Sequence, residues 1–271
     1  MTETFIKLDP RSSQSLLGEA AALRWLAEAE PSGGLHAARV VSVRARELVE
    51  ERVQTCTPTR DAAERIGRAL AATHASGAPW WGAPPAGWEG SYRIDWSLTP
   101  TVGEVAAPAT WGAFYAEHRV MAYVRALVDC GDFSPREAAV FEKVAQRLCD
   151  GAWDAPQPLL VRESGCTVAR LHGDLWAGNL LWDADASNPT GGVLIDPMAH
   201  GGHAETDLAM LALFGCPYLQ VMLAAYDEVS PLSDGWHERV ELHQLAPMLL
   251  HCVLFGGGFL GEALSMARRY A

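Results

Sequence analysis

The hydrophobic and polar positions of the first third of the chain change their period twice. Residues 4–9 alternate between apolar and polar, which predicts a short strand. Apolar residues then recur at helical spacing over 15–30, and the Pro-Ser-Gly-Gly that follows predicts the helix end. Residues 35–53 contain two valine-rich runs that are typical of strands. The opening third is therefore expected to be β-α-β-β.

Helical periodicity dominates the rest of the chain. Three stretches predict helices: residues 61–77, 110–131 and 134–150, the last with Ser134 as N-cap and Pro135 at the first helical position. The segment 78–108 is rich in Pro, Gly and Trp and has no period, so it is expected to be a long irregular loop, often a functional feature. From residue 205 onward we expect helices broken by Pro-Leu-Ser-Asp-Gly and by a triple glycine at 256–258.

This pattern predicts an α+β fold of two lobes. A small β-rich N-terminal lobe would comprise residues 1–54, and a larger, mostly helical lobe would comprise residues 55–271. A short strand predicted at 191–196, in Gly-Gly-Val-Leu-Ile-Asp, belongs to the second lobe.

Composition narrows the classes of partner. The 271 residues are 49% hydrophobic and 20% charged, as in folded globular proteins, and the formal net charge is −12. That acidic balance argues against a non-specific nucleic-acid binder or a protein that binds anionic membranes. It does not exclude an anionic substrate, because a metal ion can invert the field within one cleft.

The six cysteines favour a reducing compartment. No two of them form a C-x-x-C pair, so neither a zinc knuckle nor a thioredoxin-type motif is indicated. The sequence predicts no signal peptide, and Gly, Pro or charged residues interrupt every apolar run well short of a membrane span. We expect a cytoplasmic protein with reduced thiols.

The stretch Arg-Leu-His-Gly-Asp-Leu-Trp-Ala-Gly-Asn, residues 170–179, carries the clearest candidate chemistry. Asp174 and Asn179 are five residues apart, which is the spacing of the catalytic-loop Asp and Asn of protein kinases. A carboxylate there can accept a proton from an attacking hydroxyl, and an amide oxygen can bind a hard cation. The alternative is a turn between two strands, where Gly, Asp and Asn are common for conformational reasons.

Asp196 follows the predicted strand and lies 22 residues after Asp174. A carboxylate at the end of a strand, following a loop that contains Asp and Asn, is where a second metal ligand would be needed. An Asp-Pro turn after a core strand is the structural alternative. The two motifs in this order favour function over chance.

Lys7 and Glu19 form a third candidate pair. A strand lysine followed by a helix glutamate matches the kinase arrangement, in which the ammonium contacts nucleotide phosphates and the glutamate holds the ammonium. Taken alone, the two residues are more typical of an exposed lysine and a solvated glutamate. The downstream motifs reverse that preference.

Acidic and histidine residues after Asp196 are candidates for holding the catalytic loop in place. Asp207 is expected either to cap a helix or to accept hydrogen bonds from the backbone of the candidate catalytic loop, and we favour the latter role. Glu205, two residues before Asp207, is the other acidic candidate in this stretch. His200 and His203 are spaced H-x-x-H, which is not the i, i+4 pair of a helical zinc site, so a zinc site is not predicted.

Together with residues 170–179, the stretches 195–210 and 243–261 resemble the fructosamine kinase (ketosamine-3-kinase) family. That family belongs to the protein-kinase-like small-molecule phosphotransferases, with the aminoglycoside and choline kinases. Its members phosphorylate the 3-hydroxyl of sugars attached to amines, after which the adduct becomes unstable and is lost. The resemblance runs from Phe5 nearly to the C-terminus, and the motif H-G-D-L-W-x-G-N is its most discriminating part.

The resemblance implies a role for each candidate, with ATP and Mg²⁺ as cofactors and a small sugar-amine as the acceptor. Asp174 would be the catalytic base, with His172 supporting the loop. The remaining assignments are Asn179 and Asp196 as magnesium ligands, Lys7 and Glu19 at the ATP phosphates, the backbone from Glu51 to Val53 at adenine, and Trp176 and His251 at the sugar.

The sequence departs from the family pattern at its start. Only six residues precede Lys7, where the family has two strands and a glycine-rich phosphate loop, so the expectation is a shortened nucleotide lobe or a longer native chain. Three hypotheses follow: a ketosamine kinase, a kinase of another small molecule such as an aminoglycoside or amino alcohol, and a non-catalytic binding protein.

Overall fold

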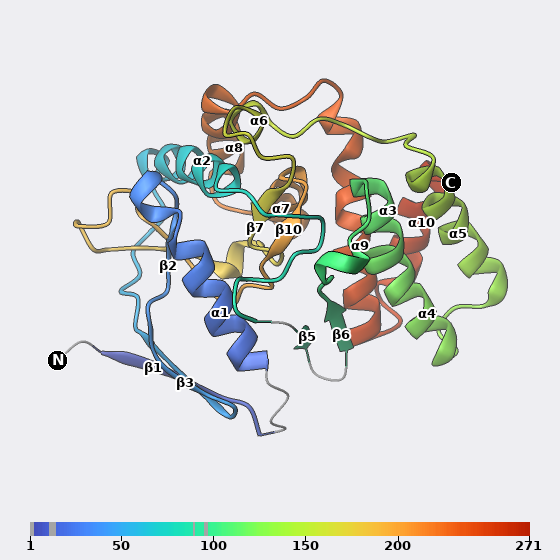
Figure 1. The fold of residues 1–271 in the computed structure, drawn as a ribbon, viewed down its shortest axis with the longest axis horizontal. Helices are drawn as coiled ribbons and strands as arrows, with labels where there is room; N and C mark the ends of the chain where they lie inside the picture. Colours follow the sequence, from blue (N-terminus) through green and yellow to red (C-terminus); the bar gives the residue numbers. More distant parts are fainter. Residues whose placement is uncertain (1–2, 11–14, 89, 95–96) are drawn as a thin grey trace.

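The fold is that of a computed structural model, which describes residues 3–10, 15–88, 90–94 and 97–271. Two lobes are visible in Figure 1: the blue strands and α1 lie at one end, and green and red helices lie at the other. The α+β, two-lobed expectation is confirmed, while residue 54 as the exact boundary stays a prediction.

The N-terminal lobe is a three-stranded antiparallel sheet covered by one helix. Its strands, in spatial order, are β1 (Thr4–Leu8), β4 (Glu47–Glu51) and β3 (Val40–Arg44). Alternation along β4 buries Leu48 and Glu50 on one face. Helix α1 (Ser15–Ala27) packs Leu16 and Ala20 against Leu48. Sequence and structure agree on β-α-β-β for these elements.

Helices form most of the second lobe. They are α2 (Arg60–Ala75), α3 (Trp111–Tyr115), α4 (Met121–Asp129), α5 (Pro135–Cys149), α6 (Leu159–Glu163), α7 (Glu205–Leu213), α8 (Leu219–Val229), α9 (Trp236–Phe255) and α10 (Leu260–Tyr270), with 3₁₀ turns at Glu104–Ala106 and Ala177–Asn179. A further 3₁₀ turn, Glu30–Ser32, follows α1 in the N-terminal part of the chain. The N-cap predicted at Ser134 is present, with Pro135 in the first turn, and the structure adds Glu137 as the reciprocal partner of a capping box.

Short strands position the loops between the lobes. Strand β7 (Ala169–Leu171) pairs antiparallel with β10 (His200–Gly202), and β8 (Leu180–Trp182) pairs antiparallel with β9 (Gly192–Leu194). Strand β2 (His36–Ala37), from the N-terminal part of the chain, adds parallel to β9. The segment 172–179 therefore runs between two anchored strands.

Two expectations need correction. The segment 78–108 is not wholly irregular, because β5 (Ser91–Ile94) and β6 (Ser97–Pro100) form a hairpin. Strands of four residues show too few alternations for a period to emerge from the sequence. The helix predicted over 110–131 is also interrupted: Ala116–Val120 is a π-helical turn between α3 and α4. Such turns are rare and occur frequently at functional sites.

Candidate functional site

Lys7 lies at the centre of an acidic cluster between the lobes. Its ammonium donates hydrogen bonds to the carboxylates of Glu19, on α1, and Asp196, after β9. The Glu50 carboxylate on β4 lies 3.8 Å away. The structure thus brings Lys7, Glu19 and Asp196 together, as the sequence interpretation expected of a nucleotide site.

One ammonium faces three carboxylates, and the electrostatics follow from that imbalance. Burial alone would lower the pKa of Lys7, but Glu19, Asp196 and Glu50 together raise it. Burial raises the pKa of Glu19 to about 7, although Lys7 opposes the shift. Burial likewise raises the pKa of Glu50. The cluster has an excess of negative charge that a bound cation would relieve.

Glu50 was not singled out in the sequence. Its side chain is only 3% exposed, and its Oε1 has no hydrogen-bond partner among the described residues. The alternation of Glu47–Glu51 was the available signal, because it places Glu50 on the same face as the apolar Leu48. An acidic residue on the apolar face of a strand marks a position that packing does not explain.

Asp174 and Asn179 lie face to face within the loop 172–179. The Asn179 amide nitrogen donates to the Asp174 carboxylate at 3.0 Å and to the Asp174 carbonyl at 2.8 Å. Burial raises the pKa of Asp174 to about 6, against this hydrogen bond, which lowers it. The loop therefore presents a carboxylate that is more basic than an ordinary aspartate.

Helix α7 holds this loop through Asp207. The Asp207 carboxylate accepts hydrogen bonds from the backbone N–H of His172, at 2.7 Å, and of Gly173, at 3.0 Å. It does not cap the helix, since the N-cap is Ala204, which makes no side-chain cap. His74, which the sequence interpretation missed, lies behind it, with Nε2 3.3 Å from the carboxylate and Nδ1 2.9 Å from the Tyr226 hydroxyl.

The loop is also fixed to the segment that carries Asp196. The His172 Nε2 lies 2.9 Å from the Ile195 carbonyl oxygen, and the Ile195 N–H donates to the Asn179 carbonyl at 3.1 Å. Asp196 itself has φ 54, in the left-handed region that non-glycine residues rarely adopt. Backbone contacts on both sides hold it there.

Asn179 and Asp196 fit a magnesium site by the chemistry of their donors. The Asn179 amide nitrogen faces Asp174, and its amide oxygen accepts no hydrogen bond from the described residues. Asp196 is 45% exposed at its side chain, and its second oxygen accepts no hydrogen bond from the part of the chain that the structure describes. Amide and carboxylate oxygens are the ligands that Mg²⁺ prefers in proteins.

A cavity of about 300 Å³ opens beside this cluster. Phe5 and Lys7 line it from β1, and Leu181 and Ile195 line it from the other lobe. Glu51 and Val53 lie at its edge, and among the described residues the Val53 N–H donates no backbone hydrogen bond. The exposed aromatic ring of Phe5 and the aliphatic side chain of Leu181 provide two apolar walls suited to a planar base.

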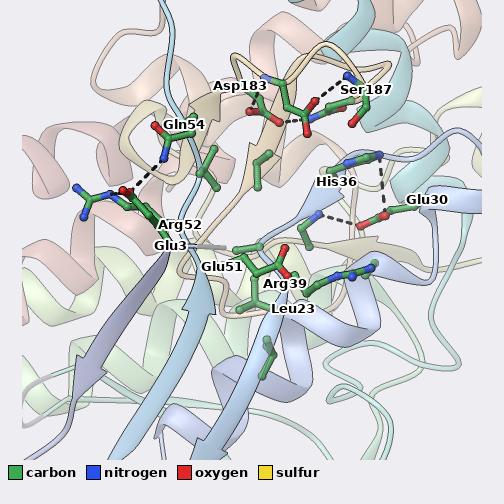
Figure 2. A pocket seen from close by; sticks show the side chains of 18 of the residues that line it. Glu3, Leu23, Glu30, His36, Arg39, Glu51, Arg52, Gln54, Asp183 and Ser187 are labelled. Carbon is green, nitrogen blue, oxygen red and sulfur yellow. Dashed lines mark hydrogen bonds and ion pairs between the residues drawn. The ribbon is translucent and has the colours of Figure 1, made fainter. Parts of the chain in front are cut away.

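A second, larger cavity of about 720 Å³ lies beside residues 51–54, which connect the two lobes (Figure 2). Two of its carboxylates contact other groups of the same cavity. Glu30 Oε1 accepts a hydrogen bond from the Ala37 N–H at 3.1 Å, and Glu3 lies 3.9 Å from the Arg52 guanidinium. Lys7, Asp174 and Asp196 are not among its lining residues, so this cavity is not the candidate catalytic site.

A third, narrower cavity of about 40 Å³ lies on the other side of Asp174. His251 lines it, as does Tyr123. Trp176, 40% exposed, is not among its lining residues but is linked to His251 through Phe214. The Trp176 and Phe214 ring centroids are 6.3 Å apart, edge-on, and those of Phe214 and His251 are 4.9 Å apart. The two predicted sugar-binding residues are thus joined by Phe214, which sequence reasoning did not find.

The buried group His203, Glu205 and His243 has atoms close enough to ligate a metal ion. Glu205, however, already binds the Arg239 guanidinium at 2.6 and 2.8 Å. A guanidinium in that place neutralises the carboxylate and repels a cation, so this cluster is an ion pair that joins α7 to α9. No helix of the described chain is long and apolar enough to cross a membrane.

Solved structures identify the class of fold. A choline kinase from Streptococcus pneumoniae superposes with a TM-score of 0.59, at 15% sequence identity, over 99% of this chain and 85% of that one. The fold is therefore that of the protein-kinase-like phosphotransferases. A structure described as a candidate fructosamine-3-kinase from Thermobifida fusca is more similar, with a TM-score of 0.83 and 40% identity over 99% of this chain and 85% of that one.

The chain belongs to the fructosamine kinase family, whose family model matches residues 1–271. A protein described as a probable ketoamine kinase, from Synechocystis, is 34% identical over 82% of this chain and 66% of its own length. The ketosamine-3-kinase of Mus musculus is 32% identical over 58% of this chain and 46% of its own length. The matches thus span less than two thirds of either relative.

Proposed function

We propose that this protein is an ATP-dependent kinase that phosphorylates the 3-hydroxyl of a ketosamine, a ketose sugar attached to an amine. One observation carries the proposal: three separate stretches of the chain meet, with Lys7 bonded to Asp196 and Asn179 bonded to Asp174. The Ile195 N–H, next to Asp196, donates to the Asn179 carbonyl and so joins the two pairs. Membership of the fructosamine kinase family supports the acceptor class.

The nucleotide would occupy the cavity of about 300 Å³. Its adenine would lie between Phe5 and Leu181, with the backbone of Glu51 to Val53 alongside. Lys7, now held between Glu19 and Asp196, would turn its ammonium to the phosphates. Asn179 and Asp196 would hold Mg²⁺, which when bound neutralises charge on the phosphate oxygens.

Asp174 would act as the general base. Its carboxylate takes the proton of the sugar hydroxyl while that oxygen bonds to the γ-phosphorus and the bond to ADP breaks. A pKa of about 6 leaves Asp174 mostly ionised at neutral pH and more basic than an ordinary aspartate. The Asn179 hydrogen bond aims the carboxylate.

The acceptor would enter over Trp176 and His251. Aromatic faces suit the apolar C–H surfaces of a sugar, and His251 supplies a polar contact. Phosphorylation of the 3-hydroxyl would make the adduct labile and so reverse glycation. A cytoplasmic location stays a prediction.

The test is an ADP-release assay with a fructosamine, ATP and Mg²⁺, comparing wild type with Asp174→Asn. We expect the variant to lose roughly 10²–10⁴-fold in kcat, because the amide cannot accept the proton. ATP with Mg²⁺ should still raise its unfolding temperature, since Asp174 faces the acceptor. Normal turnover by the variant would show that Asp174 is not the base.

A further inference from the structure

Arg119 is a buried cation at the narrow cavity beside Asp174. It lies on the π-helical turn Ala116–Val120, it is 6% exposed, and it lines the same cavity as Asp174. The π turn shifts the helical register here, which lets a guanidinium point inward from a helix whose other residues make ordinary core contacts.

Only part of the Arg119 guanidinium makes hydrogen bonds. Nη1 donates to the carbonyl oxygens of Pro100 and His118, both at 2.8 Å, and the Phe114 ring lies 4.7 Å from Cζ. Nη2 is buried and has no hydrogen-bond partner among the described residues. A buried donor on a charged group is costly to leave unmet, so this nitrogen calls for a ligand oxygen.

No described carboxylate pairs with Arg119. Burial lowers the pKa of Arg119, and the titratable groups that oppose this shift are the hydroxyls of Tyr123, Tyr115 and Tyr92. These hydroxyls are engaged elsewhere: Tyr115 with the carbonyls of α9, Tyr123 with Thr99 at 2.6 Å, and Tyr92 with the Ala199 carbonyl at 2.6 Å. The other described buried arginines that bind side chains face acids, as Arg239 faces Glu205 and Arg170 faces Glu28.

We propose that Arg119 binds a carboxylate of the acceptor, so that the preferred substrate is a ketose adduct on the α-amine of a free amino acid. This inference rests on the proposed kinase function. In such an adduct the chain C3–C2–C1–N–Cα links the carbon that bears the 3-hydroxyl to the carboxylate, and the opposite charges of Asp174 and Arg119 line one cavity. The cavity, at about 40 Å³, admits a group of carboxylate size and excludes a polypeptide.

The test compares two acceptors that differ in one group: N-fructosylglycine, with its carboxylate, and N-fructosylglycinamide, without a charge there. For wild type we expect kcat/KM to favour the acid roughly 10- to 100-fold, as a charge-assisted hydrogen bond in a buried site allows. In Arg119→Met the ratio should fall to near one. Arg125→Met, an exposed position on α4 that pairs with Glu117, is the matched control and should keep the wild-type ratio.

Calorimetric binding of both compounds, without ATP, separates this inference from the proposed function. A preference for the acid that depends on Arg119, but with neither compound phosphorylated, would remove the kinase proposal and leave the carboxylate site standing. Turnover of both compounds at equal kcat/KM by wild type would overturn the carboxylate site alone, as would failure of the acid to bind.

Arg119→Lys is a second variant that keeps the test valid if Arg119→Met does not fold. Lysine keeps the charge but lacks the planar fork, so we expect a smaller preference for the acid that still exceeds one. A preference in folded Arg119→Lys or Arg119→Met as large as that of wild type would overturn the assignment. A larger loss of affinity in Arg119→Met for a fructosamine phosphate than for the acid would also overturn it, because it would assign Arg119 to a phosphate group instead.

Discussion

At the scale of single residues, Glu19 shows how the cluster around Lys7 couples to pH. Its side chain is 16% exposed, and burial raises its pKa to about 7. A carboxyl with a raised pKa keeps its proton in the folded state at pH values where the unfolded chain has released it. Its contribution to stability is therefore present at low pH and declines as pH rises from about 4.5 to about 7.

Replacing Glu19 by Gln should remove that decline. We expect the free energy of unfolding of Glu19→Gln, relative to wild type, to shift in favour of the variant by about 1–3 kcal/mol between pH 5 and pH 8. Urea denaturation at both pH values measures it. Glu64→Gln, at a half-exposed position paired with Arg60, is the control and should show no such shift. A pH-independent difference for Glu19→Gln would contradict the shifted pKa.

The sequence was most informative about residues whose chemistry depends on local spacing. Asp174 and Asn179 are neighbours within one loop, and their contact follows from five residues of separation. Glu50, His74 and Phe214 were missed because their partners are distant in the chain, and Arg119 was missed because the π turn that aims it inward is not visible in the sequence. His74, for example, meets Asp207 across 133 positions. Only tertiary packing brings such pairs together.

At the scale of elements, the loop 172–179 depends on the turn at Gly173. Its φ is +82, and a Cβ built there would lie 2.2 Å from the Met198 carbonyl oxygen. Backbone atoms on both sides are held, the loop by Asp207 and the Met198 segment by the pairing of β10 with β7. Neither can move aside cheaply.

Gly173→Ala should therefore cost both stability and turnover. Gly165 offers a matched control, because its φ is also +82 but a Cβ there would have nothing within 4 Å. The two alanine variants share the backbone strain and differ in the clash. We expect Gly173→Ala to lose about 1–3 kcal/mol more unfolding free energy than Gly165→Ala. Equal losses would show that the loop yields, and kcat should then be normal too.

Prediction of elements from the sequence succeeded where the periodicity was long. Helices of ten or more residues and the N-cap at Ser134 were visible in the pattern. The hairpin of β5 and β6 was not, because each strand has four residues. The π turn at Ala116–Val120 was not visible either, because one extra residue in a helical turn displaces the apolar pattern too little to be recognised.

At the scale of the whole molecule, both lobes line the proposed nucleotide cavity. Phe5 and Lys7 belong to one lobe, and Leu181 and Ile195 belong to the other. A nucleotide bound there contacts both lobes only in the folded state. Binding should therefore raise the stability of the protein by mass action.

Phe5→Ala tests this placement. Phe5 is 48% exposed, so its loss should change the unfolding temperature of the free protein little. Loss of one aromatic wall should weaken ATP binding by roughly 2- to 10-fold, measured by thermal shift or calorimetry with Mg²⁺. Leu8→Ala is the control, on the same strand, 71% exposed and outside the cavity. Equal effects of the two variants would place the nucleotide elsewhere.

The two lobes are joined at two places on one hairpin. The chain at residues 54–56 bonds to β8 and its continuation, where the Cys56 N–H donates to Trp182 at 2.8 Å and the Ala184 N–H donates to Gln54 at 2.7 Å. On the other side, β2 pairs with β9, and the Ala38 N–H donates to Leu194 at 2.9 Å. The large cavity of Figure 2 lies between these two joints.

Two connections to one hairpin favour rotation of the small lobe about the line that joins them. Twisting and sliding of the small lobe would break backbone hydrogen bonds, whereas rocking about the line through both joints preserves them. The hairpin that carries this axis begins directly after Asn179 and ends two residues before Asp196. A rocking motion would therefore leave these two side chains nearly stationary, while Lys7, which contacts Asp196 from the small lobe, would move relative to them.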